Sequence, residues 1–166
     1  MIQKIDKKAV QDAVQMAYDR CKNETGGKNA DYIPYLADVP SNLFGIAACL
    51  PDGDMVAVGD TDYRFGIESV SKVPTAILAM NQYSGQEVLD KIGADATGLP
   101  FNSIMAILLE KDHPSTPLVN AGAISACSMV KPVGDSDGKW KAIVSFIAGL
   151  AGSDVEVIDE LLSLIH

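Results

Sequence analysis

The order of patterns along the chain predicts an α+β fold. An amphipathic helical pattern comes first, two apolar strands joined by a turn signal follow, and a run of helical patterns fills the remainder. The same order also fits an α/β layer that is interrupted by helices. With 166 residues, 48% of them hydrophobic and 21% charged, the chain can bury a sizeable core and does not have the composition of a disordered protein.

The first element is a helix whose apolar positions share one face. Asp6 is a suitable N-cap for it, and Gly26-Gly27 are expected to end the segment. The apolar residues recur at i, i+3, i+4, i+7 and i+11, which are the positions of Val10, Ala13, Val14, Ala17 and Cys21.

The second element is a β-hairpin. Residues 44–50 are almost wholly apolar, Pro51-Asp52-Gly53-Asp54 is a strong turn signal, and residues 55–58 return as a second strand. Because both strands are apolar on both faces, we expect other layers to cover both sides of the hairpin. Two strands make a marginal sheet, and uncovered edges invite pairing. We therefore expect a dimer or larger assembly, or poor solubility, for this chain.

From residue 68 onward the patterns are helical. Glycine and proline clusters separate six predicted helices, at residues 69–83, 86–92, 103–110, 120–130, 139–151 and 154–165. The chain is accordingly divided into residues 1–66, which hold the first helix and the hairpin, and residues 67–166, which form a helical region.

Charge and composition exclude several classes of function. A net charge of −9 disfavours binding to nucleic acid and to anionic membranes. No apolar run approaches the roughly 20 residues of a membrane span, and the first residues lack the apolar core of a signal peptide, so we expect a cytoplasmic location. We find no metal-ligand cluster and no phosphate-binding loop, and expect no cofactor. Cys21, Cys49 and Cys127 lie in apolar stretches and are expected to be small buried residues.

Ser69-Val70-Ser71-Lys72 is the first motif that carries chemistry. Ser69 and Lys72 are three residues apart, so they share one face at a helix start. A serine hydroxyl becomes an effective nucleophile when a neighbouring base takes its proton, and a neutral lysine can be that base. The free N–H groups of a helix N-terminus can hold a developing oxyanion. Alone the pattern is weak, because it also describes an N-cap serine followed by a solvated lysine. Ser71 is adjacent to Lys72 and is expected to be structural.

A second block of sequence makes the motif specific. Phe101-Asn102-Ser103-Ile104 is followed by Pro114-x-x-Pro117-Leu118-Val119-Asn120-Ala121-Gly122-Ala123-Ile124, while Asp31-Tyr32-Ile33-Pro34 and Gly59-Asp60 lie upstream. In this order and spacing the chain resembles the serine-dependent glutaminases from about Tyr32 to Ile124, and more weakly to about Asp159. The resemblance implies a β-lactamase/transpeptidase-like fold. It covers roughly the N-terminal half of that fold, so we expect an incomplete sheet.

The resemblance also implies roles for individual residues. Ser69 would be the nucleophile that forms an acyl-enzyme with glutamine, and Lys72 its general base. Tyr32 would relay a proton or bind substrate, although it could also pack its ring before an Ile-Pro turn. Asn120 would bind the substrate, or cap the helix that follows, or do both. Gly122 is expected to permit close helix packing.

Glu68 departs from the family, which usually has glutamine before the nucleophile. An ionised carboxylate only accepts hydrogen bonds, would repel the substrate's carboxylate, and could pair with Lys72. We therefore count Glu68 with Tyr32, Ser69 and Asn120 among the substrate-binding residues and expect it to influence substrate preference.

The expected activity is hydrolysis of L-glutamine to L-glutamate and ammonia. The family continues into segments that complete the substrate site, so we expect the isolated chain to be inactive. Its expected partners are L-glutamine and either further copies of itself, as a homo-oligomer, or a complementing C-terminal half, with no nucleic acid and no membrane. Two alternatives stay open, namely an acyl-serine amidase for another amide and a non-catalytic truncated paralogue that serves as an interaction module.

Overall fold

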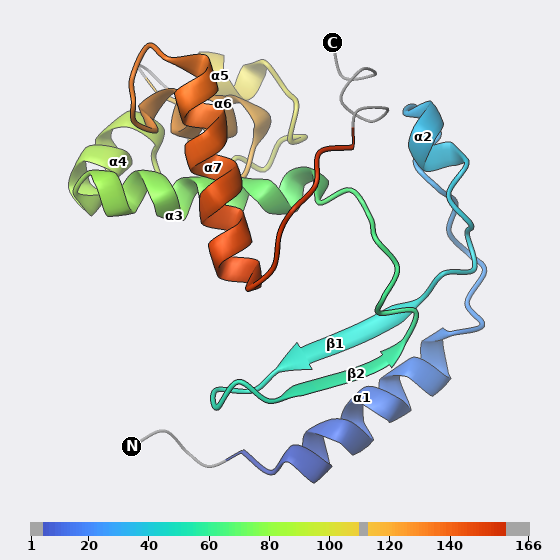
Figure 1. The fold of residues 1–166 in the computed structure, drawn as a ribbon. Coiled ribbons are helices and arrows are strands. Elements are labelled where there is room, and N and C mark those ends of the chain that lie inside the picture. Colours follow the sequence, from blue (N-terminus) through green and yellow to red (C-terminus); the bar gives the residue numbers. More distant parts are fainter. Residues whose placement is uncertain (1–4, 110–112, 159–166) are drawn as a thin grey trace. The chain divides into compact units, whose positions relative to one another are not determined.

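The computed structural model describes residues 5–109 and 113–158 (Figure 1). These residues fall into two units: unit 1 holds residues 5–66 together with Ile158, and unit 2 holds Ile67–Val157. Unit 1 contains two helices and a two-stranded sheet, and unit 2 contains the remaining helices. The predicted α+β class is therefore confirmed. No helix in the described part of the chain is long and apolar enough to cross a membrane.

Helix α1 (Lys7–Cys21) opens unit 1. The carboxylate of Asp6 caps it, as predicted, by accepting a hydrogen bond of 2.9 Å from the backbone N–H of Lys8. The helix ends before Gly26-Gly27, because Lys22 closes the last turn through its N–H to the Tyr18 carbonyl. The prediction that the glycines end this helix was wrong, because the helix ends earlier, at a backbone turn formed by Lys22.

The hairpin consists of β1 (Gly45–Cys49) and β2 (Met55–Gly59), which pair antiparallel. Helix α1 packs on one face of the hairpin, where Val56 is buried, and the Tyr18 ring stacks on Phe44 at a centroid distance of 5.4 Å. The other face carries exposed residues at alternating positions: Gly45, Ala47, Cys49, Met55 and Ala57. The expectation that both faces are covered is wrong for the described residues of unit 1, because α1 supplies a single layer.

A short helix that the patterns did not predict, α2 (Pro34–Ala37), follows the Asp31-Tyr32-Ile33-Pro34 motif. Pro34 occupies its first turn, where the missing N–H has no cost, and Ile33 before it is buried. The side-chain amide of Asn29 donates to the carbonyls of Leu36 at 3.1 Å and Val39 at 2.5 Å. These bonds hold the loop around α2 together.

Unit 2 begins with a 3₁₀ turn, η1 (Glu68–Ser71), that runs directly into α3 (Lys72–Gln82). The helices that follow are α4 (Gly85–Ile92), α5 (Met105–Leu108), α6 (Asn120–Met129) and α7 (Ser136–Ala151). Helices α3, α4 and α6 share a core cluster made of Ala79, Val88, Ile92, Ala126 and Met129. Helix α3 joins this cluster through Ala79, near the end of the helix opposite to the turn that carries Ser69.

Among the described residues, five of the six helices predicted for this region are present, with shifted ends. Helix α7 starts earlier than predicted because Asp135 caps it, accepting a bond of 2.9 Å from Gly138 N–H. Helix α5 is shorter than the predicted 103–110, and residues 110–112 lie outside the described residues. The helix predicted at 154–165 is absent over residues 154–158, and its remainder lies outside the described residues.

All three cysteines are exposed, so the expectation that they are buried was wrong. Cys49 falls on the uncovered face of the hairpin, and Cys21 is the last residue of α1. Cys127 lies on α6 between the buried Ala126 and the exposed Ser128, away from the core cluster. Each cysteine has apolar neighbours in sequence, but its side chain lies on an exposed face of its helix or strand.

Candidate active site

Ser69 lies in the turn that opens α3, as the Ser-x-x-Lys motif predicts. The backbone N–H of Lys72 donates to the Ser69 carbonyl inside this turn. The Ser69 side chain is exposed, and among the described residues its hydroxyl has no hydrogen-bond partner. The Ser71 hydroxyl, by contrast, donates to the Glu68 carbonyl at 2.6 Å, and the Ser71 carbonyl accepts from Thr75 Oγ1 at 2.8 Å. Ser71 is therefore engaged in the turn, and the expectation that it is structural is confirmed.

Glu68, immediately before Ser69, has a backbone φ of +45°. This is the left-handed region, which non-glycine residues enter at a cost of about 1–2 kcal/mol. The residue redirects the chain at the point where η1 starts. No ion pair joins Glu68 to Lys72 in the described structure, so the pairing considered from the sequence is not present.

Lys72 instead turns its amine towards the second block of sequence. Its Nζ donates to the side-chain oxygen of Asn120 at 2.7 Å and to the Leu118 carbonyl at 3.4 Å. The same nitrogen lies 5.7 Å from the centre of the Phe101 ring, within the range of a cation–π contact. In the part of the chain that the structure describes, no hydrogen bond links the side chains of Lys72 and Ser69. The fold thus brings together Lys72 and Asn120, which are 48 residues apart.

Asn120 is the first residue of α6, and the N-cap of that helix is Val119. No side-chain capping bond is present, so the interpretation of Asn120 as the cap is wrong. Its backbone N–H donates to the Phe101 carbonyl at 2.9 Å, which ties the start of α6 to the Phe101 segment. Asn120 therefore meets Lys72 through its side chain and Phe101 through its backbone.

Gly122 lets the loop before α6 come close to the helix. A Cβ atom at this position would lie 1.8 Å from the Thr116 carbonyl oxygen and 3.0 Å from Pro117 Cα. The prediction that Gly122 permits close packing between helices is wrong, because the close neighbour is loop backbone. This contact fixes the loop that supplies the Leu118 carbonyl to Lys72.

Tyr32 belongs to unit 1, whereas Ser69, Lys72 and Asn120 belong to unit 2. Its side chain is 76% exposed, so the alternative that it packs its ring finds no support within its own unit. Tyr32 directly precedes the buried Ile33 and α2, which anchor its backbone. Its role as a catalytic or substrate-binding residue stays a prediction.

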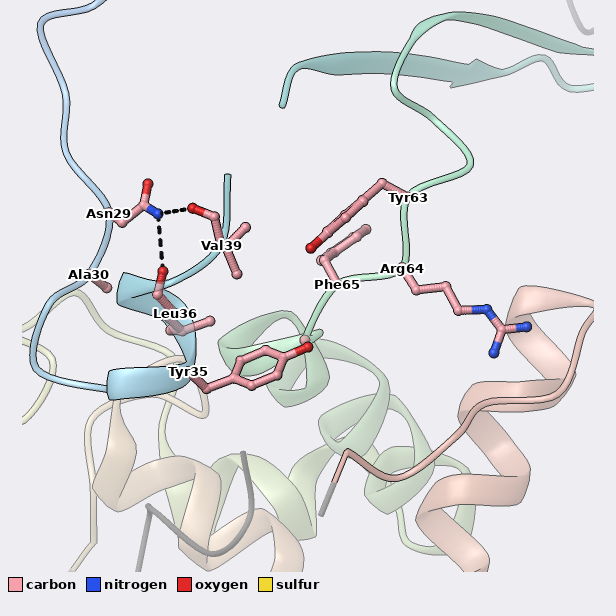
Figure 2. A pocket seen from close by; sticks show the side chains of 9 residues that line it. Asn29, Ala30, Tyr35, Leu36, Val39, Tyr63, Arg64 and Phe65 are labelled. Atoms are coloured by element: carbon pink, nitrogen blue, oxygen red, sulfur yellow. Dashed lines mark hydrogen bonds between the residues drawn. The ribbon is translucent and has the colours of Figure 1, made fainter. Parts of the chain in front are cut away.

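Unit 1 also contains a cavity of about 290 Å³ that sequence reasoning did not find (Figure 2). The ring of Tyr35 lies on one side of it and the side chains of Tyr63 and Phe65 lie on the other. The Asn29 amide at its edge already bonds the backbone of the α2 loop. The signal in the sequence is a group of aromatic residues, but nothing in their spacing indicates that residues 29–39 meet residues 63–66.

The chain was also compared with known proteins. The glutaminase family model matches residues 27–164. A glutaminase from Bacteroides thetaiotaomicron is 68% identical over 161 residues, which are 97% of this chain and 50% of that protein. A glutaminase from Parabacteroides distasonis is 66% identical over the same length and covers the same shares. The chain therefore spans about half the length of the curated relatives it matches.

Solved structures give the same picture. The structure described as probable glutaminase ybaS has a TM-score of 0.85 at 46% identity, over 89% of this chain and 47% of that one. A probable glutaminase from Bacillus subtilis, complexed with 6-diazo-5-oxo-L-norleucine, has a TM-score of 0.68 at 26% identity, over 99% of this chain and 48% of that one. With the matching motifs and their spatial arrangement, these comparisons show that the chain belongs to the glutaminase family.

Proposed function

We propose that this chain is the nucleophile-bearing part of a glutaminase that hydrolyses L-glutamine to L-glutamate and ammonia. The observation that carries the proposal is the hydrogen bond of 2.7 Å between Lys72 and Asn120. Lys72 lies three residues after Ser69, an exposed serine at a helix start. Curated glutaminases that are 66–68% identical support it. So does a solved relative, Mglu, whose structure is described as its tris and glutamate form and which has a TM-score of 0.83 at 28% identity.

The reaction has two halves. In the first, Ser69 Oγ attacks the side-chain carboxamide carbon of glutamine, Lys72 accepts the serine proton, and that proton leaves with the ammonia. Backbone N–H groups at the helix start are the proposed donors to the developing oxyanion. In the second half, a water molecule attacks the acyl ester while Lys72 serves again as the base, which releases glutamate and restores the serine hydroxyl.

Three further residues complete the proposal. Tyr32 relays a proton or hydrogen-bonds the substrate, and Asn120 and Glu68 contact the amino-acid end of glutamine. The fold is proposed to be of the β-lactamase/transpeptidase type, and the location to be cytoplasmic.

We also propose that a C-terminal half or further copies of the chain cover its exposed apolar surfaces. The uncovered hairpin face supports this in unit 1, and large exposed side chains support it in unit 2, among them Ile104, Leu108, Leu109 and Ile124.

The test is reconstitution. The 166-residue chain alone should release no measurable ammonia from glutamine, and adding the separately produced second half of the B. thetaiotaomicron relative should restore release. Ser69→Ala should then reduce activity to background. Ser71→Ala is the matched control and should keep activity, because its hydroxyl serves only the turn. Glu68→Gln should lower KM for glutamine if the carboxylate repels the substrate.

Other outcomes would redirect the proposal. Ammonia release that survives Ser69→Ala contradicts the serine mechanism. Restored activity on a different amide, with glutamine ignored, favours the acyl-serine amidase. A reconstituted protein that is folded but acts on no amide leaves the non-catalytic interaction module.

A further inference from the structure

The amine of Lys72 has more neighbours than its proposed role as a base requires. One is the Asn120 side-chain oxygen, one is the Leu118 carbonyl, and the third is the face of the Phe101 ring. All three come from residues 101–120, the block that lies far from the Ser-x-x-Lys motif in sequence. Lysine has a long flexible side chain, so a fixed direction for its amine must come from such neighbours.

These neighbours are joined to one another. The Phe101 carbonyl accepts the backbone N–H of Asn120 at 2.9 Å, so the ring and the amide oxygen belong to one hydrogen-bonded assembly. The Leu118 carbonyl is held next to them by the loop that packs against Gly122. The assembly presents two oxygen acceptors and one π face to a single amine. Such an arrangement fits an amine held in one place.

We propose that Asn120 and Phe101 are positioning residues that hold the Lys72 amine, with the amide oxygen of Asn120 as acceptor and the Phe101 ring as cover. For Asn120 this role is additional to the proposed substrate contact, because the side-chain oxygen bonds Lys72 and the side-chain nitrogen is left for the substrate. For Phe101 the positioning role follows from the place of its ring beside the Lys72 amine, and not from its being aromatic. That the held lysine acts as a base rests on the proposed function; the holding itself does not.

The test measures how fast each lysine of the full chain reacts with trace amounts of acetic anhydride, read by mass spectrometry of peptides. Asn120→Ala should speed acetylation of Lys72 about fivefold, the factor expected for one lost hydrogen bond. Phe101→Leu should speed it about twofold, as expected for a lost exposed cation–π contact. Phe101→Tyr keeps a ring and should leave Lys72 close to its original rate. Asn120→Asp keeps an oxygen acceptor but adds a negative charge 2.7 Å from the amine, so it should slow acetylation of Lys72.

The same chain contains an internal reference. Lys131 also contacts a carbonyl, that of Gln82 at 3.4 Å, and an aromatic ring, that of Tyr83 at 4.6 Å, and it lies in the same unit. Its rate should not change in any of these variants. Asn102→Ala and Ile104→Val, at exposed positions beside Phe101, are the matched controls and should leave Lys72 unchanged.

An unchanged Lys72 rate in both Asn120→Ala and Phe101→Leu overturns the proposal. A rise at Lys72 and Lys131 together in both variants overturns it as well, because it shows a general loosening of the unit and no specific hold. These readouts need no catalysis, so they separate failure of this inference from failure of the proposed function.

A second test measures kcat and KM for glutamine in the reconstituted enzyme. If Asn120 positions the base, Asn120→Ala lowers kcat, in addition to any rise in KM from the lost substrate contact. If KM rises while kcat is unchanged, Asn120 binds substrate and does not position Lys72, which contradicts the proposal for this residue.

Discussion

The two units of this chain bury their apolar residues in different ways. In unit 1 a single helix lies on one face of a two-stranded hairpin, and the other face is exposed. In unit 2 three helices enclose a cluster in which Ala79, Ile92 and Ala126 are fully buried. Stability in unit 2 therefore comes from its own core, whereas unit 1 depends on one layer of contacts. The candidate base Lys72 and its partners lie in the unit with the core.

The largest expected effect concerns the two cores. Ile92→Ala should lower the free energy of unfolding of unit 2 by about 2–5 kcal/mol, since it leaves a cavity in a fully buried site. Urea unfolding followed by the fluorescence of Trp140, the single tryptophan and a residue of α7, measures this directly. Val56→Ala, in the thin core of unit 1, is the paired change and should not move the Trp140 transition. Equal shifts from both variants would show that the two units unfold as one and that unit 2 is not stabilised by its own core alone.

The next effect concerns glycines at close approaches. Gly122→Ala should destabilise unit 2 by about 1–3 kcal/mol, because the added methyl group overlaps the Thr116 carbonyl. In the acetylation assay it should also expose Lys72, since the displaced loop carries the Leu118 carbonyl. Gly85→Ala, in the same unit and with no atom near its Cβ position, should change stability by less than about 0.5 kcal/mol.

Gly59 is the counterpart in unit 1. Its φ is +84°, and a Cβ there would lie 2.3 Å from the Phe44 carbonyl oxygen and 2.4 Å from the Tyr18 ring. Gly59→Ala should reduce the far-UV circular dichroism signal of the hairpin and α1 while the Trp140 transition stays in place. A shift of that transition would show that the two units unfold together.

The smallest expected effect is a dependence on pH in unit 2. At the start of α4, Ser84 and Glu87 form a capping box, and the backbone hydrogen bond from Ser84 holds the pKa of Glu87 below its ordinary value of 4.5. A lowered pKa in the folded state stabilises the fold above the ordinary value, and this contribution is lost as the pH falls through the folded value. The stability advantage of the wild type over Glu87→Gln should therefore shrink between about pH 6 and pH 3. A constant difference in the Trp140 urea midpoint across this range would contradict this role.

Local patterns predicted much of the fold. The cap at Asp6, the hairpin and the start of α3 follow from residues that are neighbours in sequence, so their signals are contained in a short window. Helix α2 was missed because it has only four residues, too few for a periodic pattern. The cysteines were misjudged because an apolar neighbourhood does not specify which face of a helix or strand is covered.

The candidate site was predictable as a set of residues but not as a set of contacts. The motifs single out Ser69, Lys72 and Asn120, and the fold brings the last two together. The Phe101 ring above the amine could not be read from spacing, because residues 101–120 reach Lys72 only through tertiary folding. Tyr32 shows the limit of the motif, since it resides in the other unit.

The left-handed backbone at Glu68 has a consequence for how this position can vary. Its φ of +45° disfavours side chains that are branched at Cβ, because this conformation costs them the most. The backbone conformation does not distinguish a charged side chain from a neutral one of the same shape. Glutamine and glutamate have nearly the same shape and meet the backbone requirement equally. The residue before the nucleophile can therefore exchange an amide for a carboxylate without a new fold. Under the proposed role of Glu68 in substrate binding, such an exchange would alter substrate preference with the backbone of this turn kept.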